Sequence, residues 1–543
     1  MGLIMILLSR ISPVSKKVEN EHESSKGLPI LTQSLCPECL SVIDASIFEK
    51  DDKIFMEKTC DQHGFFYDLI SSDAKFFKLM LERDYGSSSP VTNPMESKNM
   101  TCPNNCGICE EHLSSPIMIN IDLTNRCNLS CPICFANADA SGRLLELSID
   151  QVRNMLDTVL STNEVQPICL QYTGGEPTVH PLFLEALREA DKRNFTQVQI
   201  ATNGIKFAYD PEFAFQASEA GLNTAYLQFD GMNDQIYRKS RGRNLIDLKL
   251  RAIDNLAKAQ IRTVLVPTIV KGLNDKNVGE ILKYALKNVE KIAGISWQPV
   301  AFTGRIDVKQ RMEQRFTIAD LARELQEQTG IVQMYRDWYP YSFVEPFNKL
   351  LEAITGQKQI AFSCNPACGV GTYLVVNSQT EQALPVPKFA DVEPLMKKML
   401  DIEESINSRR LFSSLSVANK LRRLKQFYHQ EKGPAGWKFN DFMEFMMDFA
   451  EFRNRFPDNE ARQKTIGNTP FRAFLMASMH FQDVYNYQID RVKRCVIHYA
   501  APDGRIYPFC TYNSGPYHRE RIERDYSIPV IKETENMDAP VIS

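Results

Sequence analysis

The sequence has no long hydrophobic run and no strong excess of charge of one sign. Its apolar start, residues 1–8, is too short to span a bilayer and has no preceding basic residue, as a signal peptide would. The 63 Lys and Arg residues nearly balance the 67 Asp and Glu residues, which leaves a net charge of −4. A chain without a basic excess has no general attraction for phosphate backbones. The sequence therefore predicts no transmembrane segment and no nucleic-acid partner.

Cysteine is too sparse for a disulfide scaffold, with 14 cysteines in 543 residues. These cysteines are grouped at short spacings instead of being spread along the chain, which indicates metal binding. Grouped thiols in a chain without a signal peptide favour a reducing compartment. We therefore expect a cytoplasmic, oxygen-sensitive protein.

The residue pattern divides the chain into four predicted segments. Residues 1–30 are mostly polar and are expected to be a disordered leader. Residues 31–114 combine cysteines with short apolar alternations, as small metal-binding modules do. Residues 115–305 alternate between strand and helix patterns, and residues 306–543 are predicted to form a helical domain with an auxiliary cluster. Within this last segment, the stretch from about 390 to 490 is expected to be largely helical.

Six strand-like runs alternate with amphipathic helical segments in the third segment. The runs are residues 117–123, 168–172, 197–201, 225–229, 263–269 and 294–299. Successive βα units of this kind predict an α/β fold with a parallel sheet, open or closed into a barrel. Ligands of such sheets bind at the carboxyl ends of the strands.

Three cysteines with the spacing Cys-x3-Cys-x2-Cys follow the first predicted strand. Cys127, Cys131 and Cys134 can ligate three irons of a [4Fe–4S] cluster and leave the fourth iron open. An open iron can chelate the amino and carboxylate groups of S-adenosylmethionine (SAM) beside a cluster that donates one electron. For the spacing alone, a zinc knuckle or a chance group of thiols is the alternative.

The ends of the next three predicted strands carry residues that suit the same ligand. Paired glycines let the backbone approach a ligand, a glutamate can accept hydrogen bonds from an ammonium group, and amides and carboxylates can contact a ribose. The candidate residues are Gly174, Gly175, Glu176, Asn203, Gln228 and Asp230. Each motif is weak alone, but their order after one Cys-x3-Cys-x2-Cys loop favours a single SAM site.

With these motifs, the chain resembles the radical SAM superfamily. The resemblance implies a partial (β/α)6 TIM-like barrel over residues 115–305, with an N-terminal metal-binding module and a C-terminal helical, cluster-binding extension. It implies that Cys127, Cys131 and Cys134 are the catalytic cluster ligands and that residues 174–176 hold the methionine amine. Asn203, Gln228 and Asp230 would then contact the ribose or the amino-acid group. A reductant such as ferredoxin or flavodoxin would supply the electron.

The cysteines near the N-terminus can be divided in two ways. One division gives a zinc-ribbon or rubredoxin-like site with Cys36, Cys39, Cys60 and His63. The other joins the first Cys-x2-Cys pair to Cys106 and Cys109 in a four-thiolate iron site and leaves His63 outside. The spacing does not decide between them.

Two further groups of cysteines flank the predicted barrel. Cys102, Cys106 and Cys109 repeat the Cys-x3-Cys-x2-Cys spacing, but no βα series of their own follows, so a second cleavage site is not expected. Four C-terminal thiols are enough to ligate one [4Fe–4S] cluster fully, or they are two unrelated buried pairs. These thiols belong to Cys364, Cys368, Cys495 and Cys510.

The whole layout narrows the resemblance to the tetraether lipid synthase group, which includes proteins linked to methylation of methanopterin. The N-terminal cysteines and the motifs at 362–369, 494–499 and 502–513 carry this resemblance. It implies auxiliary [4Fe–4S] clusters, a rubredoxin-like iron or a zinc, and a 5′-deoxyadenosyl radical that abstracts hydrogen from an unactivated carbon.

Three functions follow from this resemblance and from the residues. The first is lipid-chain carbon–carbon coupling in lipid biosynthesis, with peripheral membrane contact and an apolar tunnel. Residues 334–341 and 442–449 could line that tunnel, although a role as core is favoured. The alternatives are radical methylation of a pterin-like small molecule and a non-catalytic iron–sulfur electron carrier.

Overall fold

The computed structural model describes residues 27–95, 101–138, 141–408, 414–450, 470–516 and 518–529. Residues 1–26 of the predicted leader lie outside these ranges. Within them, the chain forms a four-stranded antiparallel sheet near the N-terminus and a large mixed sheet. No helix in the described part of the chain is long and apolar enough to cross a membrane.

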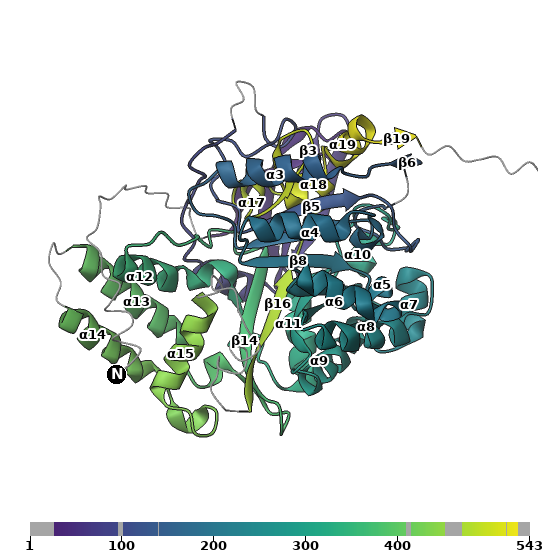
Figure 1. The fold of residues 1–543 in the computed structure, drawn as a ribbon. Helices are drawn as coiled ribbons and strands as arrows, with labels where there is room; N and C mark the ends of the chain where they lie inside the picture. The colour runs from purple at the N-terminus through teal and green to yellow at the C-terminus, as the bar shows by residue number, and fades with distance from the viewer. Residues whose placement is uncertain are drawn as a thin grey trace, which may run out of the picture.

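Six parallel strands form the middle of the large sheet, in the spatial order β12-β10-β9-β8-β7-β5. Two of them, β5 and β8, are labelled in Figure 1. Their bounds are β5 Met118–Thr124, β7 Cys169–Gly174, β8 Gln197–Thr202, β9 Thr224–Gln228, β10 Arg262–Val266 and β12 Ile292–Pro299. Each strand overlaps one of the six predicted runs, so the predicted parallel α/β architecture is confirmed. The carboxyl ends of these strands form one edge, where the predicted motifs lie.

Amphipathic helices connect the strands and bury their apolar faces against the sheet. These helices are α3 Ile149–Ser161, α4 Phe183–Lys192, α6 Pro211–Glu219, α8 Ile246–Lys258 and α9 Val278–Lys287. Helix α3 begins with a capping box, in which the Ser148 hydroxyl accepts from the Gln151 N–H and the Gln151 side chain accepts from the Ser148 N–H. Its buried residues, including Leu156, belong to the same core as Ile119 and Leu170 of the sheet.

The C-terminal segment adds strands to both sides of the six, which the sequence analysis did not predict. Strand β16 (Phe471–Met479) pairs parallel to β12, and β17 (Ile497–Ala500) pairs parallel to β5. The prediction of a helical stretch from about 390 to 490 was therefore wrong over β16. A Cβ atom at Gly294 of β12 would lie 2.5 Å from the Leu475 carbonyl oxygen, so glycine permits this close pairing.

The remaining C-terminal helices form a layer beside the sheet, drawn in green in Figure 1. The layer contains α12 Glu345–Thr355, α13 Val392–Asn407, α14 Ser414–Arg422 and α15 Phe439–Ala450. It has a hydrophobic core of its own, to which Phe347, Leu395 and Phe442 belong. Strand β14 (Gly369–Asn377) runs antiparallel to β16 and joins this layer to the large sheet.

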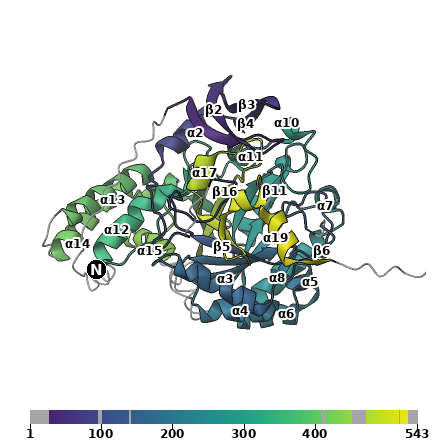
Figure 2. The ribbon, with the colours of Figure 1, turned by 90° about the horizontal axis from the view of Figure 1, so that it is seen from above.

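The N-terminal sheet is small and lies at the top of Figure 2. It consists of β1 Ile30–Leu35, β2 Val42–Lys50, β3 Lys53–Cys60 and β4 Gly64–Ser71, followed by α2 Ala74–Glu82. Its buried hydrophobic cluster contains only a few residues, among them Ile47, Ile54 and Met56. A module with so small a core requires additional cross-links for stability.

The described residues also form further strands and α-helices, most of them short. They are β6 Arg143–Leu144, α5 Ile205–Tyr209, α7 Asp234–Arg241, β11 Thr268–Ile269, α10 Arg311–Gln314, α11 Ile318–Thr329, β13 Tyr339–Pro340, β15 Ala383–Pro385, α17 Ile489–Lys493, β18 Ile506–Pro508, α18 Phe509–Asn513, α19 His518–Tyr526 and β19 Ile528–Pro529. The predicted boundaries between the four segments stay predictions.

Candidate active site and metal centres

The loop after β5 carries Cys127, Cys131 and Cys134 at the carboxyl edge of the parallel strands. All three are half-buried and line one cavity of about 650 Å³, which we call the barrel cavity. Burial raises the pKa of Cys127 to about 12, so its thiolate forms when a metal displaces the proton. Three thiols that line one cavity fit a cluster with one iron left free for a ligand.

Two arginines hold the backbone of this cluster loop. The Arg305 side chain donates to the Cys131 carbonyl oxygen at 3.1 Å, and the backbones of Arg305 and Cys134 exchange two hydrogen bonds at 2.8 and 2.9 Å. Arg241 donates to the Ile133 carbonyl oxygen at 2.8 Å. These contacts act on backbone groups of the loop. Burial raises the pKa of the Cys131 thiol, and the nearby Arg241 guanidinium partly offsets this rise.

Asp230 lies behind the wall of the cavity with its side chain fully buried. It forms a bidentate ion pair with Arg241 at 2.6 and 3.0 Å and accepts a hydrogen bond from Gln228 at 2.6 Å. Burial alone would raise the pKa of Asp230, but the Arg241 guanidinium holds it below its usual value. Asp230 therefore positions the arginine that holds the cluster loop, while its predicted contact with SAM stays a prediction.

Gly174 and Gly175 end β7 directly against the start of the cluster loop. Gly174 has a φ of +130°, and a Cβ atom there would lie 2.1 Å from the Thr124 carbonyl oxygen. A Cβ atom on Gly175 would lie 2.1 Å from the Arg126 carbonyl oxygen. The two glycines thus permit contact between two backbones as well as lining the cavity.

Glu176 links the ends of two strands from a fully buried position. Its carboxylate accepts hydrogen bonds from the Thr202 hydroxyl at 2.8 Å and from the Asn203 N–H at 2.7 Å. Asn203 and Gln228 line the cavity, whereas Glu176 lies behind it. The predicted contacts of these three residues with SAM stay predictions.

Lys249 of α8 is a buried residue of the site that the sequence analysis missed. Its ammonium group donates to the Asn203 carbonyl oxygen at 2.6 Å and to Gln228 Oε1 at 2.7 Å. Burial lowers the pKa of Lys249 to about 7. The only indication in the sequence that Lys249 is buried is its position in the helix, next to Leu248 and one turn before Ile253, which are both buried.

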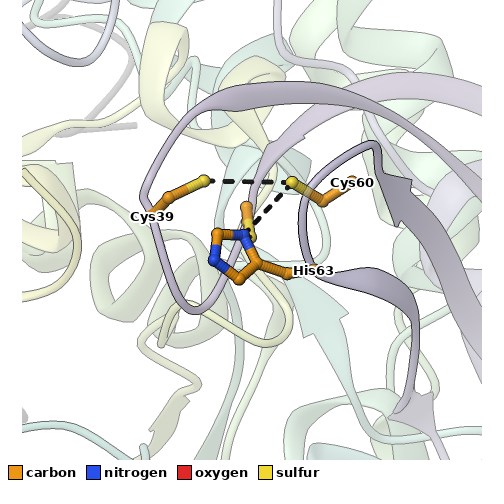
Figure 3. A group of neighbouring side chains, drawn as sticks. Cys39, Cys60 and His63 are labelled. Carbon is orange, nitrogen blue, oxygen red and sulfur yellow. Dashed lines mark hydrogen bonds between the residues drawn. The ribbon is translucent and has the colours of Figure 1, made fainter.

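The predicted ribbon ligands meet between two turns of the N-terminal sheet (Figure 3). Ligand atoms of Cys36, Cys39, Cys60 and His63 all lie within 4.8 Å of one another. His63 Nδ1 is 3.5 Å from Cys60 Sγ and 3.6 Å from Cys36 Sγ. Tetrahedral zinc, with bonds of about 2.3 Å to sulfur and about 2.0 Å to nitrogen, places its ligand atoms at such separations. The four residues therefore fit one metal ion.

Cys102, Cys106 and Cys109 form a separate group. Burial, with the nearby thiols of Cys102 and Cys109, raises the pKa of Cys106 well above its usual value. The alternative that joined Cys106 and Cys109 to the first Cys-x2-Cys pair is wrong, because that pair converges with Cys60 and His63 instead.

The structure also brings the four C-terminal cysteines together. They are Cys364, Cys368, Cys495 and Cys510. Burial raises the pKa of Cys364, and the nearby Cys368 thiol raises it further. Burial and the nearby Cys510 thiol raise the pKa of Cys495 in the same way. Arg491 Nε lies 3.4 Å from the Cys368 sulfur, and the Gln482 N–H donates to Cys510 at 3.4 Å. A [4Fe–4S] cluster at either of these last two cysteine groups stays a prediction.

Aromatic side chains connect the cluster loop to the C-terminal cysteines. Phe135, next to Cys134, lies 5.4 Å in ring centroid distance from Phe509, next to Cys510. Phe481 stacks on Phe509 at 3.9 Å, and all three rings line the barrel cavity. The two cysteine groups are therefore connected through one apolar wall of the cavity.

Comparison with known proteins agrees with this arrangement. Residues 121–285 match the radical SAM superfamily, and residues 29–72 match the HMPTM N-terminal zinc ribbon domain. The chain is 37% identical to the 7,8-dihydro-6-hydroxymethylpterin dimethyltransferase of Methanocaldococcus jannaschii over 501 residues. This alignment covers 92% of this chain and 96% of the relative. The chain belongs to this family of radical SAM enzymes.

More distant similarities cover smaller parts of this pterin dimethyltransferase family member. Mycofactocin maturase of Mycolicibacterium smegmatis is 27% identical over 178 residues, which is 33% of this chain and 44% of the maturase. The solved structure of SuiB from Streptococcus suis bound to S-adenosylmethionine is 15% identical with a TM-score of 0.33, over 40% of this chain and 48% of SuiB. These values are too low for an argument about function.

Membership in the pterin dimethyltransferase family decides between several predictions. A radical SAM enzyme uses a [4Fe–4S] cluster, SAM and a reductant, so the alternative of a non-catalytic electron carrier does not apply. The ribbon match supports a metal at the N-terminal site. The relative is named for a pterin and not for a lipid, so the order of the two substrate predictions is reversed and lipid biosynthesis has no support.

Proposed function

We propose that this protein is a radical SAM methyltransferase that methylates the ring system of a dihydropterin such as 7,8-dihydro-6-hydroxymethylpterin. The observation that carries the proposal is the 37% identity that extends over 92% of the chain. The ribbon has its own match, over residues 29–72. When bound, the [4Fe–4S] cluster and SAM supply one-electron reductive cleavage and a 5′-deoxyadenosyl radical able to take hydrogen from carbon.

The residues around the barrel cavity would bind and enclose the reactants. The cavity volume of about 650 Å³ lies within the usual range for small-molecule sites, roughly 300–1,000 Å³. Asn203 and Gln228 present polar groups near the cluster loop, while Phe481 and Phe509 form an apolar wall. Such a wall excludes water, which protects a reactive intermediate from side reactions.

The test is an anaerobic reaction of the reconstituted protein with SAM, a reductant and 7,8-dihydro-6-hydroxymethylpterin. We expect 5′-deoxyadenosine and a pterin with added methyl groups, both detected by mass spectrometry. SAM labelled with deuterium in its methyl group would show whether SAM is also the methyl source. Formation of 5′-deoxyadenosine without any methylated pterin would reject the substrate assignment.

A matched pair of cysteine variants controls for general damage to the protein. Cys131→Ala removes a ligand of the cleavage cluster and should abolish 5′-deoxyadenosine while leaving metal at the other sites. Cys169→Ala changes a buried cysteine of β7 that does not line the barrel cavity and should retain activity. Survival of 5′-deoxyadenosine formation in Cys131→Ala would place the cleavage cluster elsewhere.

A further inference from the structure

A row of amide side chains crosses the interior of the barrel. Asn120 of β5, Gln171 of β7 and Gln199 of β8 are direct neighbours in the strand register. Gln199 donates to Gln171 Oε1 at 2.7 Å, and Gln171 donates to Asn120 Oδ1 at 2.7 Å. Interiors of such barrels are usually filled by branched apolar side chains. We call these three residues the amide row.

The ends of the amide row fix the orientation of every amide in it. At one end, Gln197 donates to Gln199 Oε1 at 2.7 Å. At the other end, Asn120 donates to the backbone carbonyl oxygen of His498 in β17, at 3.1 Å. A backbone carbonyl can only accept, so the donors along the row must all point the same way. The amides are therefore held in one orientation before a ligand arrives.

Asn120 and Gln171 line the barrel cavity below the predicted SAM site. They lie two residues before Asp122 and Thr173 on their strands, so their side chains share a face with those residues, about 6.6 Å deeper in the barrel. The row thus faces the part of the cavity where a substrate would lie beneath the cluster loop.

The hydrogen bonds within the row leave groups available for a ligand. A primary amide has two N–H donors and two acceptor lone pairs. Asn120 and Gln171 each use one donor and one lone pair within the row. Asn120 is fully buried and positions Gln171, whereas Gln171 is partly exposed and retains one donor and one acceptor for a ligand. Such a pair complements a heterocycle edge that carries both a hydrogen-bond donor and an acceptor oxygen.

We propose that Gln171, held in position by Asn120, recognises the amino–oxo edge of the planar heterocyclic substrate. This inference rests on the proposed function, because a pterin carries such an edge. Tyr226 and Tyr341 line the same cavity and supply aromatic faces for a flat ring. The row then determines the specificity and the depth at which the ring binds.

The test uses the cluster-loaded enzyme and two ligands, 7,8-dihydro-6-hydroxymethylpterin and its analogue with a 2-oxo group in place of the 2-amino group. The wild type should bind the pterin more tightly than the analogue by about tenfold or more, because the exchanged group no longer matches the fixed donors and acceptors. Gln171→Leu should lose most of this preference, measured by calorimetry and by KM, while the Kd for SAM stays the same.

Gln197→Leu is the matched control, because Gln197 belongs to the same hydrogen-bonded chain but does not line the cavity. The His498 carbonyl oxygen still fixes the direction of the row in this variant. The variant should keep the wild-type preference even if the protein is less stable. Asn120→Leu is a second variant with the same expected loss of preference, for use if Gln171→Leu does not fold.

The outcomes separate this inference from the proposed function. An unchanged preference in folded Gln171→Leu or Asn120→Leu, with a wild type that methylates the pterin, would overturn the role of the amide row alone. A wild type that neither binds nor methylates the pterin would overturn both.

Discussion

At the scale of single residues, several polar groups of the site bind protein instead of facing the cavity. Asp230 is committed to Arg241, and Glu176 is committed to the Thr202 hydroxyl and the Asn203 N–H. Buried carboxylates need such partners, since an unpaired buried charge is costly. Glu176 and Asp230 therefore position Asn203 and Gln228, which line the cavity.

Glu345, at the start of α12, gives a prediction about pH. Its side chain is buried and accepts a hydrogen bond from the Phe362 N–H at 2.8 Å, and burial raises its pKa to about 7. An unfolded chain releases this proton near pH 4.3, so between about pH 4.3 and 7 the folded state binds more protons. The free energy of unfolding should therefore fall across this range, by up to about 3 kcal/mol from this group.

Glu345→Gln should remove this pH dependence, because a neutral amide keeps an oxygen for the Phe362 N–H. We expect the variant to gain stability relative to the wild type as the pH rises from 5 to 8, as measured by thermal unfolding. Glu404→Gln, at an exposed position of α13, is the control and should follow the wild type. A constant difference between Glu345→Gln and the wild type from pH 5 to 8 would contradict the prediction.

At the scale of elements, the N-terminal ribbon depends on its metal more than the barrel does. Its four strands share a small hydrophobic cluster, and the four metal ligands close its two turns. In modules of this kind, metal binding supplies much of the free energy of folding.

Removing one ligand should therefore unfold the ribbon locally. We expect Cys60→Ser to lose the metal ion of this site, measured by elemental analysis, which also identifies the ion as zinc or iron. Hydrogen exchange should accelerate in β1 to β4 and stay unchanged in β7 and β8. His63→Cys replaces one ligand by another, so the site keeps four ligands and should retain the ion. Protected amides in a metal-free ribbon would contradict this expectation.

At the scale of the whole molecule, a buried ion network joins three parts of the chain. Arg315 lies between the barrel and α11, and its side chain is fully buried. It pairs with Asp483, which follows β16, at 2.6 Å, and with Asp68 of β4 at 3.1 Å. Asp483 also accepts a hydrogen bond at 2.8 Å from the N–H of Phe302, at the end of the barrel. The network therefore joins the ribbon, the barrel and the C-terminal segment.

Arg315→Met should destabilise the protein by about 3 kcal/mol, because Asp483 would stay buried without its cation. Denaturant unfolding followed by circular dichroism measures the change, and the ribbon should separate from the barrel as a distinct transition. Lys291→Met breaks a surface pair with Asp254 and should cost at most about 1 kcal/mol. Equal stability of the two variants would show that the network does not join these parts.

The metal ribbon, the cluster loop and the six parallel strands could be predicted from the sequence, because each depends on spacing over a few residues. A Cys-x3-Cys-x2-Cys loop and an alternating apolar pattern keep their meaning wherever they lie in the chain. The contacts of β16 and β17 could not be predicted in this way. Their partners, β12 and β5, lie far away in the sequence, and the strand pattern does not specify a partner.

The sequence by itself thus determined the chemistry that the protein can perform, because ligand type and spacing define a metal site. Only the tertiary structure decided that His63 completes the ribbon site and that Asp230 supports the cluster loop. It also brought Asn120 and Gln171 into one row inside the barrel. Folding brings together residues from distant segments of the chain. Their burial and hydrogen bonds decide which polar side chains contact other protein groups and which stay free to contact a ligand.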